Sequence, residues 1–310
     1  MFSKKSEQDK QKGKTKKRPK TRKEKIITFI KDIIFAVIVV FVIIKAFIVE
    51  TSRVPTPSME NTILVGDFLF VNKFIYGASS LRNIPFTNVR LPYFSLPGFR
   101  DPERGDIIVF EYPGDRDQLE PTEILSYVKR CIGLPGDTVQ IVDKLVFVNG
   151  KRVPVPNKIQ YRDPNIVEPI GHDPWKRIFP KGSNWSRDNY GPLVVPYFGE
   201  VINLNKDNIE IFRTIINRDY EREVVKVVDT LIYIDGKIEN TYTMKDDYYF
   251  MMGDNRDNSL DSRYWGFVPR EKILGQPFMI FWSWNSDIPF SDIFRLLGSI
   301  RLSRIAKVVD

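Results

Sequence analysis

The sequence predicts a mainly β protein with antiparallel sheets, one N-terminal transmembrane helix and an inserted β-rich subdomain. Short runs rich in β-branched and aromatic residues recur at 67–71, 106–110 and 278–282, which is typical of strands. Asn-Gly or Asp-Gly follows an apolar run at 145–151 and at 231–237, and these dipeptides are the strongest short-range signal for a β-hairpin. A single long apolar segment near the N-terminus predicts the helix.

The first 25 residues carry the excess positive charge of this 310-residue chain. They hold twelve Lys and Arg against three acids, whereas the rest is close to neutral and the whole chain has a net charge of +8. The segment 1–25 lacks the apolar content that folding needs, so we expect a disordered basic tail. A protein that binds nucleic acid usually carries its basic surface on the folded body, so no nucleic acid is expected as a partner.

The segment 26–49 is predicted to be a transmembrane anchor, with the lipid bilayer as its partner. Residues 33–44 are apolar without a break and the run resumes after Lys45, which reaches the lower limit of about 17 residues for a spanning helix. A cleavable signal peptide is the alternative, but the charged region before the run is unusually long and no small-x-small cleavage site follows. Because Lys and Arg precede the anchor, the tail is expected in the cytoplasm and the body on the extracytoplasmic (periplasmic) side of the inner membrane.

The body is expected to form one domain from residues 50–141 and 246–310, into which residues 142–245 are inserted. The two hairpin signals bracket this insert, and its several X-Pro steps favour extended connections. Downstream of the anchor, only residues 290–305 suggest a helix. The aromatic run 278–284 is expected to be a buried strand, and a surface that faces the membrane is the alternative.

The scarcity of cysteine and histidine limits the chemistry available to this chain. One cysteine, Cys131, excludes an intrachain disulfide, and one histidine, His172, leaves too few ligands for zinc. Cys131 lies in an apolar context and is expected to be a small core residue, whereas His172 is expected in a loop. No metal or cofactor is expected, and a hydrolytic serine would need a base other than histidine.

A neutral lysine can act as that base, because its amine can accept a hydroxyl proton and later return it to the leaving group. The pKa of a free lysine is about 10.4, and burial among apolar groups lowers it. Lys129 stands in an apolar predicted strand, where Arg130 would face the opposite side. Ser58 follows the anchor by fewer than ten residues, so it is the candidate nucleophile of a membrane-apposed hydrolase.

Four blocks in one order carry a family resemblance. They are Val-Pro-Thr-Pro-Ser-Met at 54–59, the run 66–77, the pair 104–110 and 127–137, and a polar turn at 253–262 that continues into Arg-Tyr-Trp-Gly-Phe. These blocks resemble the signature boxes of the bacterial type I signal peptidases, also called leader peptidases. The resemblance implies an antiparallel β-sheet Ser/Lys protease fold. It also implies a membrane-bound serine endopeptidase that removes N-terminal signal peptides from exported preproteins, in association with the secretion machinery.

The resemblance also implies the roles of the reacting groups. Ser58 would attack the scissile carbonyl with Lys129 as general base. The Ser58 N–H and the Thr56 hydroxyl would form the oxyanion hole. Thr56 and Pro57 stand where the family most often has Ser and Gly, and Asn61 stands where it has Pro.

Further roles follow from the same resemblance. Ser259 would orient the lysine amine by hydrogen bonding, and Asp261 and Arg263 would pair to hold the polar turn against the site. The substrate pocket would admit small side chains, chiefly Ala, at the first and third residues before the cut. Its expected lining residues are Val54, Tyr127, Val128, Met251, Met252 and Leu260, of which the last replaces an Ala found in several relatives.

Three other classes of protein compete with this interpretation. A self-cleaving Ser/Lys repressor needs a DNA-binding domain and no membrane anchor, and this chain has the reverse pattern. A penicillin-binding protein needs Ser-x-x-Lys, but Asn61 stands three residues after Ser58. A membrane-anchored, non-enzymatic extracytoplasmic receptor or assembly factor remains possible if Asp254, Asp257 and Asp261 bind calcium, although their spacing fits a calcium loop only loosely.

Overall fold

The computed structural model describes residues 21–47, 49–77 and 96–309. The chain separates into two compact units, residues 1–44 and 45–310. Helix α1 (Arg22–Phe47) is 26 residues long, and its sequence contains no Gly or Pro that would interrupt it. Across the described ranges, no helix is both long enough and apolar enough to cross a membrane. The basic tail lies outside these ranges, apart from its last residues.

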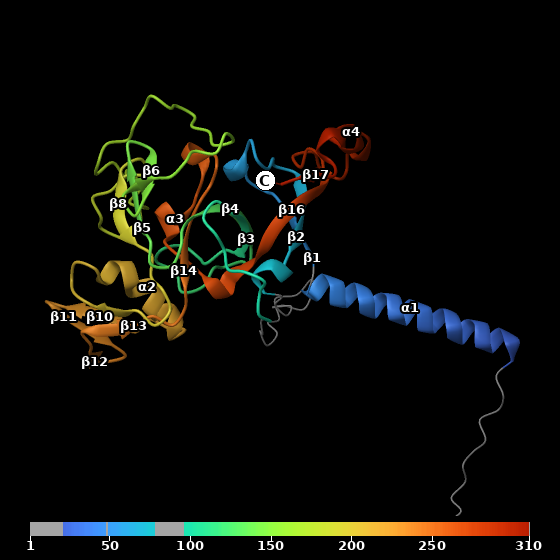
Figure 1. The fold of residues 1–310 in the computed structure, drawn as a ribbon, viewed down its shortest axis with the longest axis horizontal. Coiled ribbons are helices and arrows are strands. Elements are labelled where there is room, and N and C mark those ends of the chain that lie inside the picture. The colour runs from blue at the N-terminus through green and yellow to red at the C-terminus, as the bar shows by residue number, and fades with distance from the viewer. Residues whose placement is uncertain (1–20, 48, 78–95, 310) are drawn as a thin grey trace, which may run out of the picture. The chain divides into compact units, whose positions relative to one another are not determined.

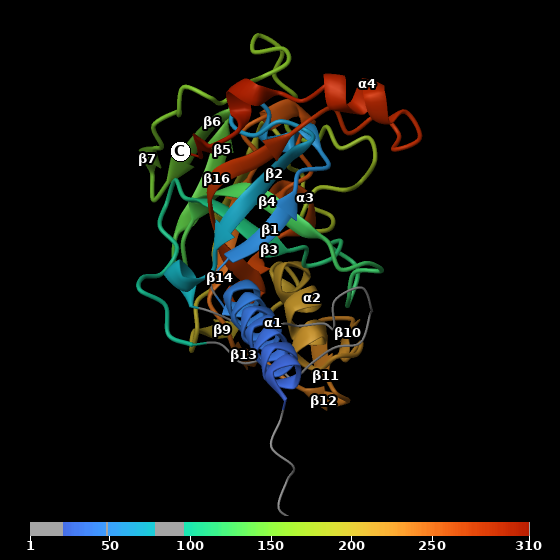
Figure 2. The same cartoon turned by 90° about the vertical axis from the view of Figure 1, so that its right-hand side faces the viewer.

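The main sheet of the second unit is antiparallel, which confirms the predicted mainly β class (Figure 1). Its strand order is β1-β2-β16-β3-β4-β14-β15, and β17 pairs with β16. Figure 2 shows β2 and β16 side by side, as their pairing requires. The strands are β1 (Val49–Arg53), β2 (Asp67–Asn72), β3 (Ile107–Glu111), β4 (Ser126–Gly133), β14 (Tyr248–Met252), β15 (Val268–Pro269), β16 (Ile273–Ser283) and β17 (Lys307–Val308).

Three smaller sheets come from the middle of the chain. Their orders are β7-β6-β5-β8, β10-β11-β12 and β13-β9. Both predicted hairpins form, and in each the two turn residues have positive φ, as a tight hairpin with Asn-Gly or Asp-Gly requires. The strands are β5 (Thr138–Val142), β6 (Leu145–Val148), β7 (Lys151–Arg152), β8 (Tyr190–Val194), β9 (Val201–Asn203), β10 (Val225–Val228), β11 (Leu231–Ile234), β12 (Lys237–Ile238) and β13 (Thr241–Thr243).

The expectation that residues 290–305 hold the only helix of the body was wrong. Helix α2 (Ile209–Asp219) forms in the middle of the chain, where it buries Ile209, Phe212 and Ile216 on one face. Its isoleucines and threonine have modest helix propensity, so packing of this face stabilises it more than the local sequence does. Residues 290–305 form only the short helix α4 (Ile293–Gly298) and a 3₁₀ turn, and another short helix, α3 (Ser262–Trp265), follows the polar turn.

The hydrophobic core crosses the expected border of the insert. One cluster packs Ile132 and Val139 of the expected catalytic domain with Phe212 of α2 and Phe250 of β14. The sheet of β5 to β8 also spans the border at 142. A second cluster contains Val54, Met59 and Val128, and it fixes the segment that carries the candidate nucleophile. The division into catalytic and inserted domains stays a prediction.

Candidate active site

Ser58 lies in a 3₁₀ turn (Pro57–Met59) a few residues after β1. Thr56 precedes a proline and is extended, with φ −127° and ψ 153°, because the proline ring disfavours the helical region for the residue before it. Pro57 begins the turn, where its missing N–H costs nothing. Met59 is buried in the core and therefore anchors the nucleophile segment (residues 54–62).

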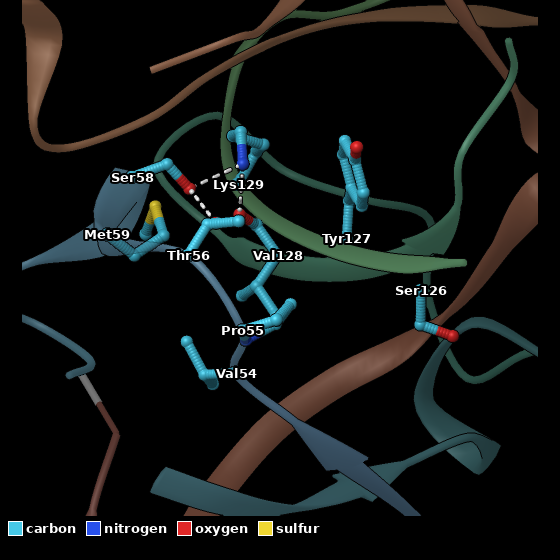
Figure 3. Close-up of a pocket in the computed structure, with 9 residues that line it drawn as sticks. All are labelled: Val54, Pro55, Thr56, Ser58, Met59, Ser126, Tyr127, Val128 and Lys129. Atoms are coloured by element: carbon cyan, nitrogen blue, oxygen red, sulfur yellow. Dashed lines mark hydrogen bonds between the residues drawn. The ribbon is translucent and has the colours of Figure 1, made fainter. Parts of the chain in front are cut away.

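Lys129 lies within β4, opposite Ile108 of β3, and its side chain reaches Ser58 (Figure 3). The Lys129 Nζ donates to Ser58 Oγ at 2.7 Å and to the Val128 carbonyl at 3.0 Å. Burial lowers the pKa of this lysine from 10.5 to about 8, and Asp261 and Asp254 act in the opposite direction but do not offset it. The amine is therefore positioned to lose its proton close to neutral pH.

Thr56 places a hydroxyl beside the nucleophile. Its Oγ1 lies 3.3 Å from Ser58 Oγ, and the side chain is exposed and caps no helix N–H. Figure 3 shows Thr56 and Lys129 approaching Ser58 from different elements. The structure thus brings the three expected reacting groups together.

A pocket opens beside these groups (Figure 3). Three of the six expected pocket residues, Val54, Tyr127 and Val128, line it. Met251 and Met252 are buried in core clusters and do not line this pocket, because β14 presents them to the packing on either side of the sheet. The remaining lining residues are Pro55, Thr56, Ser58, Met59, Ser126 and Lys129. The other expected pocket residue, Leu260, is 42% exposed and lies outside this lining.

The polar turn (residues 253–262) is held by a buried ion pair. Arg263 donates to both carboxylate oxygens of Asp261 at 2.8 Å, and both side chains are almost fully buried. Burial alone would raise the pKa of Asp261, but the Arg263 guanidinium holds it below its usual value. Asp261 also accepts the Gly253 N–H at 3.1 Å, and Arg263 donates to the Arg256 carbonyl at 2.7 Å. The pair therefore links the last residues of the turn to its first residue and to its middle.

The buried hydroxyl of Ser259 has no hydrogen-bond partner among the described residues. Its hydroxyl packs against Gly253, where an added Cβ would lie 2.2 Å from Ser259 Oγ. Within the described chain, the hydrogen bonds of the Lys129 amine go to Ser58 and Val128 instead. The expected bond between Ser259 and the lysine amine is not formed in this structure.

Sequence reasoning missed a second buried ion pair beside the site. Arg130, next to Lys129 on β4, donates to both oxygens of Asp254 at 2.8 Å. Thr62 of the nucleophile segment donates to the same carboxylate at 2.6 Å. Asp254 therefore joins the strand of the lysine to the segment of the serine. The only sequence signal for this ion pair was the arginine next to Lys129. Its acidic partner lies 124 positions away, and one sequence does not show which of the acids it pairs with.

The expected calcium ligands of the alternative interpretation are engaged elsewhere. Asp254 pairs with Arg130 and Asp261 with Arg263, while Asp257 pairs with Lys144 at 3.1 Å. Across the described residues, no cluster of three or more His, Cys, Asp or Glu could hold a metal ion. These carboxylates are satisfied by cationic side chains, so the polar turn does not fit a calcium loop.

A serine hydroxyl bonded to a buried lysine beside an open pocket is typical of a serine hydrolase with a lysine base. The family model "Signal peptidase, peptidase S26" matches residues 26–282. The chain belongs to this family of serine peptidases, which confirms the resemblance drawn from the four blocks. Membership removes the non-enzymatic alternative and implies a protein associated with membranes.

Individual relatives agree with the family. A signal peptidase I of Buchnera aphidicola subsp. Schizaphis graminum is 35% identical over 76% of this chain and 69% of its own length. A signal peptidase I of Rickettsia typhi is 32% identical over 83% of this chain and 84% of its own. A crystal structure of a signal peptidase I from Enterococcus faecalis V583 shares 22% identity over 57% of this chain and 97% of that chain, and its TM-score of 0.27 supports no argument about the fold.

Proposed function

We propose that Ser58 is the nucleophile and Lys129 the general base with which this chain, a member of the signal peptidase family, cleaves signal peptides from preproteins. The observation that carries the proposal is the 2.7 Å contact between Lys129 Nζ and Ser58 Oγ, made by an amine whose pKa burial lowers to about 8. The separation lies within the range of about 2.6–3.2 Å that direct proton transfer needs.

The reaction follows from this geometry. The neutral Lys129 amine takes the Ser58 proton while Oγ bonds to the scissile carbonyl carbon, whose π electrons move to the oxygen. When the tetrahedral species collapses, the C–N bond breaks and the Lys129 ammonium gives its proton to the leaving amine. The same amine then removes a proton from water as the water oxygen attacks the acyl carbon. When this second tetrahedral species collapses, the bond from the acyl carbon to Ser58 Oγ breaks and the Lys129 ammonium returns the proton to Oγ.

The oxyanion needs donors that are in place before the attack. We assign these to the Ser58 N–H and the Thr56 hydroxyl. The position of Thr56 Oγ1, 3.3 Å from Ser58 Oγ, supports the second assignment. Thr56 is β-branched, which restricts its χ1 angle, and its backbone is extended before Pro57, so the position of its hydroxyl oxygen is restricted.

The polar turn is proposed to support the dyad. The buried Asp261–Arg263 pair keeps the turn in one conformation, and Gly253 packs against the Ser58 carbonyl and Ser259. We propose that Ser259 orients the lysine amine after a side-chain rotation, when Ser58 is acylated and no longer accepts from Lys129. Its buried position in the turn supports this role.

The pocket is proposed to select small side chains at the first and third residues before the cut. Val54, Tyr127 and Val128 line a pocket that adjoins Ser58, and their side chains leave little room in it. Met251 and Met252 would act from the core behind the site, and the exposed Leu260 would contact the preprotein.

The location of the enzyme is also a proposal beyond its association with membranes. We propose that residues 26–49 anchor the chain once in the inner membrane, with the tail in the cytoplasm and the body on the periplasmic side, near the secretion machinery. The unbroken apolar run 33–44 and the positive charge before it support this arrangement.

One experiment tests the proposed reaction. The detergent-solubilised full chain is incubated with a purified preprotein, and the new N-terminus is sequenced. Cleavage should follow a small residue and should vanish in Ser58→Ala and in Lys129→Ala. The double variant should lose little more than either single variant, because nucleophile and base act as one unit. A Lys129→Ala chain that keeps a substantial part of the wild-type rate would exclude the dyad.

A further inference from the structure

One residue from the middle of the chain, Gln160, lies directly against the polar turn. Its N–H donates to the Asp254 carbonyl at 3.0 Å, and its carbonyl accepts the Arg256 N–H at 3.0 Å. The two bonds form an isolated parallel β-bridge across Asn255. This bridge comes from the segment 142–245, whose role the family resemblance leaves open.

The Gln160 side chain extends the bridge to the nucleophile segment. Asn61 donates to Gln160 Oε1 at 2.7 Å, and Gln160 Nε2 donates to Glu60 Oε2 at 3.3 Å. The same Glu60 oxygen accepts from Asn255 Nδ2 at 3.2 Å. One glutamine thus contacts both segments, and it uses both the donor and the acceptor of its amide.

Two residues at this bridge, Asp254 and Asn255, also contact the elements that carry Lys129 and Ser58. Asp254 binds Arg130, the neighbour of Lys129 on β4. The Asn255 N–H donates to the Ser58 carbonyl at 3.0 Å. A displacement of this dipeptide would therefore move the lysine and the serine relative to each other.

We propose that Gln160 is a positioning residue for the Ser58/Lys129 dyad, so that the middle segment of the chain helps to assemble the active site. The inference rests on the proposed function. Gln160 touches neither reacting group, and it acts through Glu60 and Asn255. A misplacement of about 1 Å can cost on the order of 100-fold in rate, so a contact at this distance from the chemistry can control kcat.

A charge exchange tests the contact with Glu60. Gln160→Glu places a second carboxylate against Glu60 and should lower kcat about tenfold, with KM within about twofold of wild type. Adding Glu60→Gln should restore kcat to within about twofold, because the amide nitrogen at 60 can donate to the carboxylate at 160. Asn255 Nδ2 then keeps its other acceptor, the Pro57 carbonyl at 3.2 Å. A residue that only supports folding would not show this reciprocal rescue.

The control is Asn157→Ala, an exposed amide in the same segment, which should keep the wild-type kcat. A second readout needs no cleavage. The backbone N–H of Asn255 donates to the Ser58 carbonyl. Its hydrogen exchange should be faster in Gln160→Glu and should slow again in the double variant. Wild-type kcat and exchange in Gln160→Glu, or a double variant that is not rescued, would overturn the proposal. If the wild-type chain cleaves no preprotein, the proposed function fails, while amide exchange still decides the role of Gln160.

Discussion

A lysine amine can act as a base near neutral pH only where its surroundings disfavour the ammonium form. Lys129 meets this condition because it is 2% exposed and its contacts with Ser58 and the Val128 carbonyl are neutral. The two acids that favour its ammonium form, Asp261 and Asp254, are each paired with an arginine, which limits how far they can stabilise it. At the residue scale, two ion pairs thus leave the amine free to act as a base.

The pH dependence of cleavage should report this lysine. The pKa of Lys129 is lowered from 10.5 to about 8, so the neutral amine becomes the major form as the pH rises through about 8. The expected result is a kcat/KM that increases with pH along a single limb with its midpoint near 8. This pH profile would be measured as steady-state cleavage of a preprotein from about pH 6 to about pH 10, in steps of about one pH unit.

The matched control for this profile is the single histidine. His172 has an exposed side chain, and its nearest carboxylate is that of Glu168, at 4.0 Å. His172→Ala should therefore leave the limb unchanged. A limb that disappears in this variant, or a midpoint that stays near 10.5, would contradict the assignment of Lys129.

The hydroxyl of Thr56 should matter more than its shape. Thr56→Val keeps the branched side chain and deletes only the proposed oxyanion donor, so kcat should fall on the order of 10²–10³-fold with a smaller change in KM. Thr56→Ser keeps the hydroxyl and should remain active. Steady-state kinetics of the two variants provide the comparison, and a Thr56→Val enzyme as fast as wild type would show that other groups hold the oxyanion.

At the scale of elements, the site depends on contact between the polar turn and the nucleophile segment. Gly253 approaches the Ser58 carbonyl so closely that an added Cβ would lie 2.5 Å from it. Asn255 then donates to the same carbonyl at 3.0 Å. The glycine is required here for the close approach and not for an unusual backbone conformation, since its φ does not lie in the left-handed region.

Gly253→Ala should therefore separate the two elements. The new methyl would meet the Ser58 carbonyl and Ser259 Oγ, so the nucleophile must shift, and kcat should fall by about 100-fold or more. The chain should still fold, with a loss of about 1–3 kcal/mol in the free energy of unfolding. Kinetics and denaturant unfolding measure the two effects separately.

Gly298→Ala is the control for this substitution. An added Cβ at Gly298 meets no atom within 4 Å, and its φ is not positive. It should leave both kcat and the free energy of unfolding close to wild type. An equal loss of activity in the two variants would show that the close approach at Gly253 does not matter.

At the scale of the whole molecule, charge and hydrophobicity are separated along the chain. The excess positive charge lies in the tail, and the apolar run 33–44 follows it. The proposed topology predicts that a protease added to spheroplasts digests the body and leaves a fragment that contains residues 26–49. Immunoblots against the tail and the body would follow the two parts. A body that stays intact while an exported marker protein is digested would refute this topology.

Three strands of the main sheet and the two hairpins of the smaller sheets were predictable, because their local sequences are typical of strands and tight turns. β2, β3 and β16 are runs of β-branched and aromatic residues, and both hairpins carry the Asn-Gly or Asp-Gly turns that need positive φ. Helix α2 was not predictable in the same way, because its isoleucine-rich sequence also suits a strand. Only the packing of its apolar face against the core selects the helix.

For the candidate site too, local sequence determined some features and tertiary packing determined others. The sequence by itself determined the residue types and the family blocks that nominate Ser58, Lys129 and Thr56. With one histidine and one cysteine it left too few ligands for zinc, and it predicted a loop position for His172. The tertiary structure decided how these residues are held: Arg130 pairs with Asp254, and Gln160 bridges the polar turn to the nucleophile segment. The physical reason is that local conformation depends on neighbours along the chain. An ion pair or hydrogen bond between residues far apart forms only where the packed core brings them within reach.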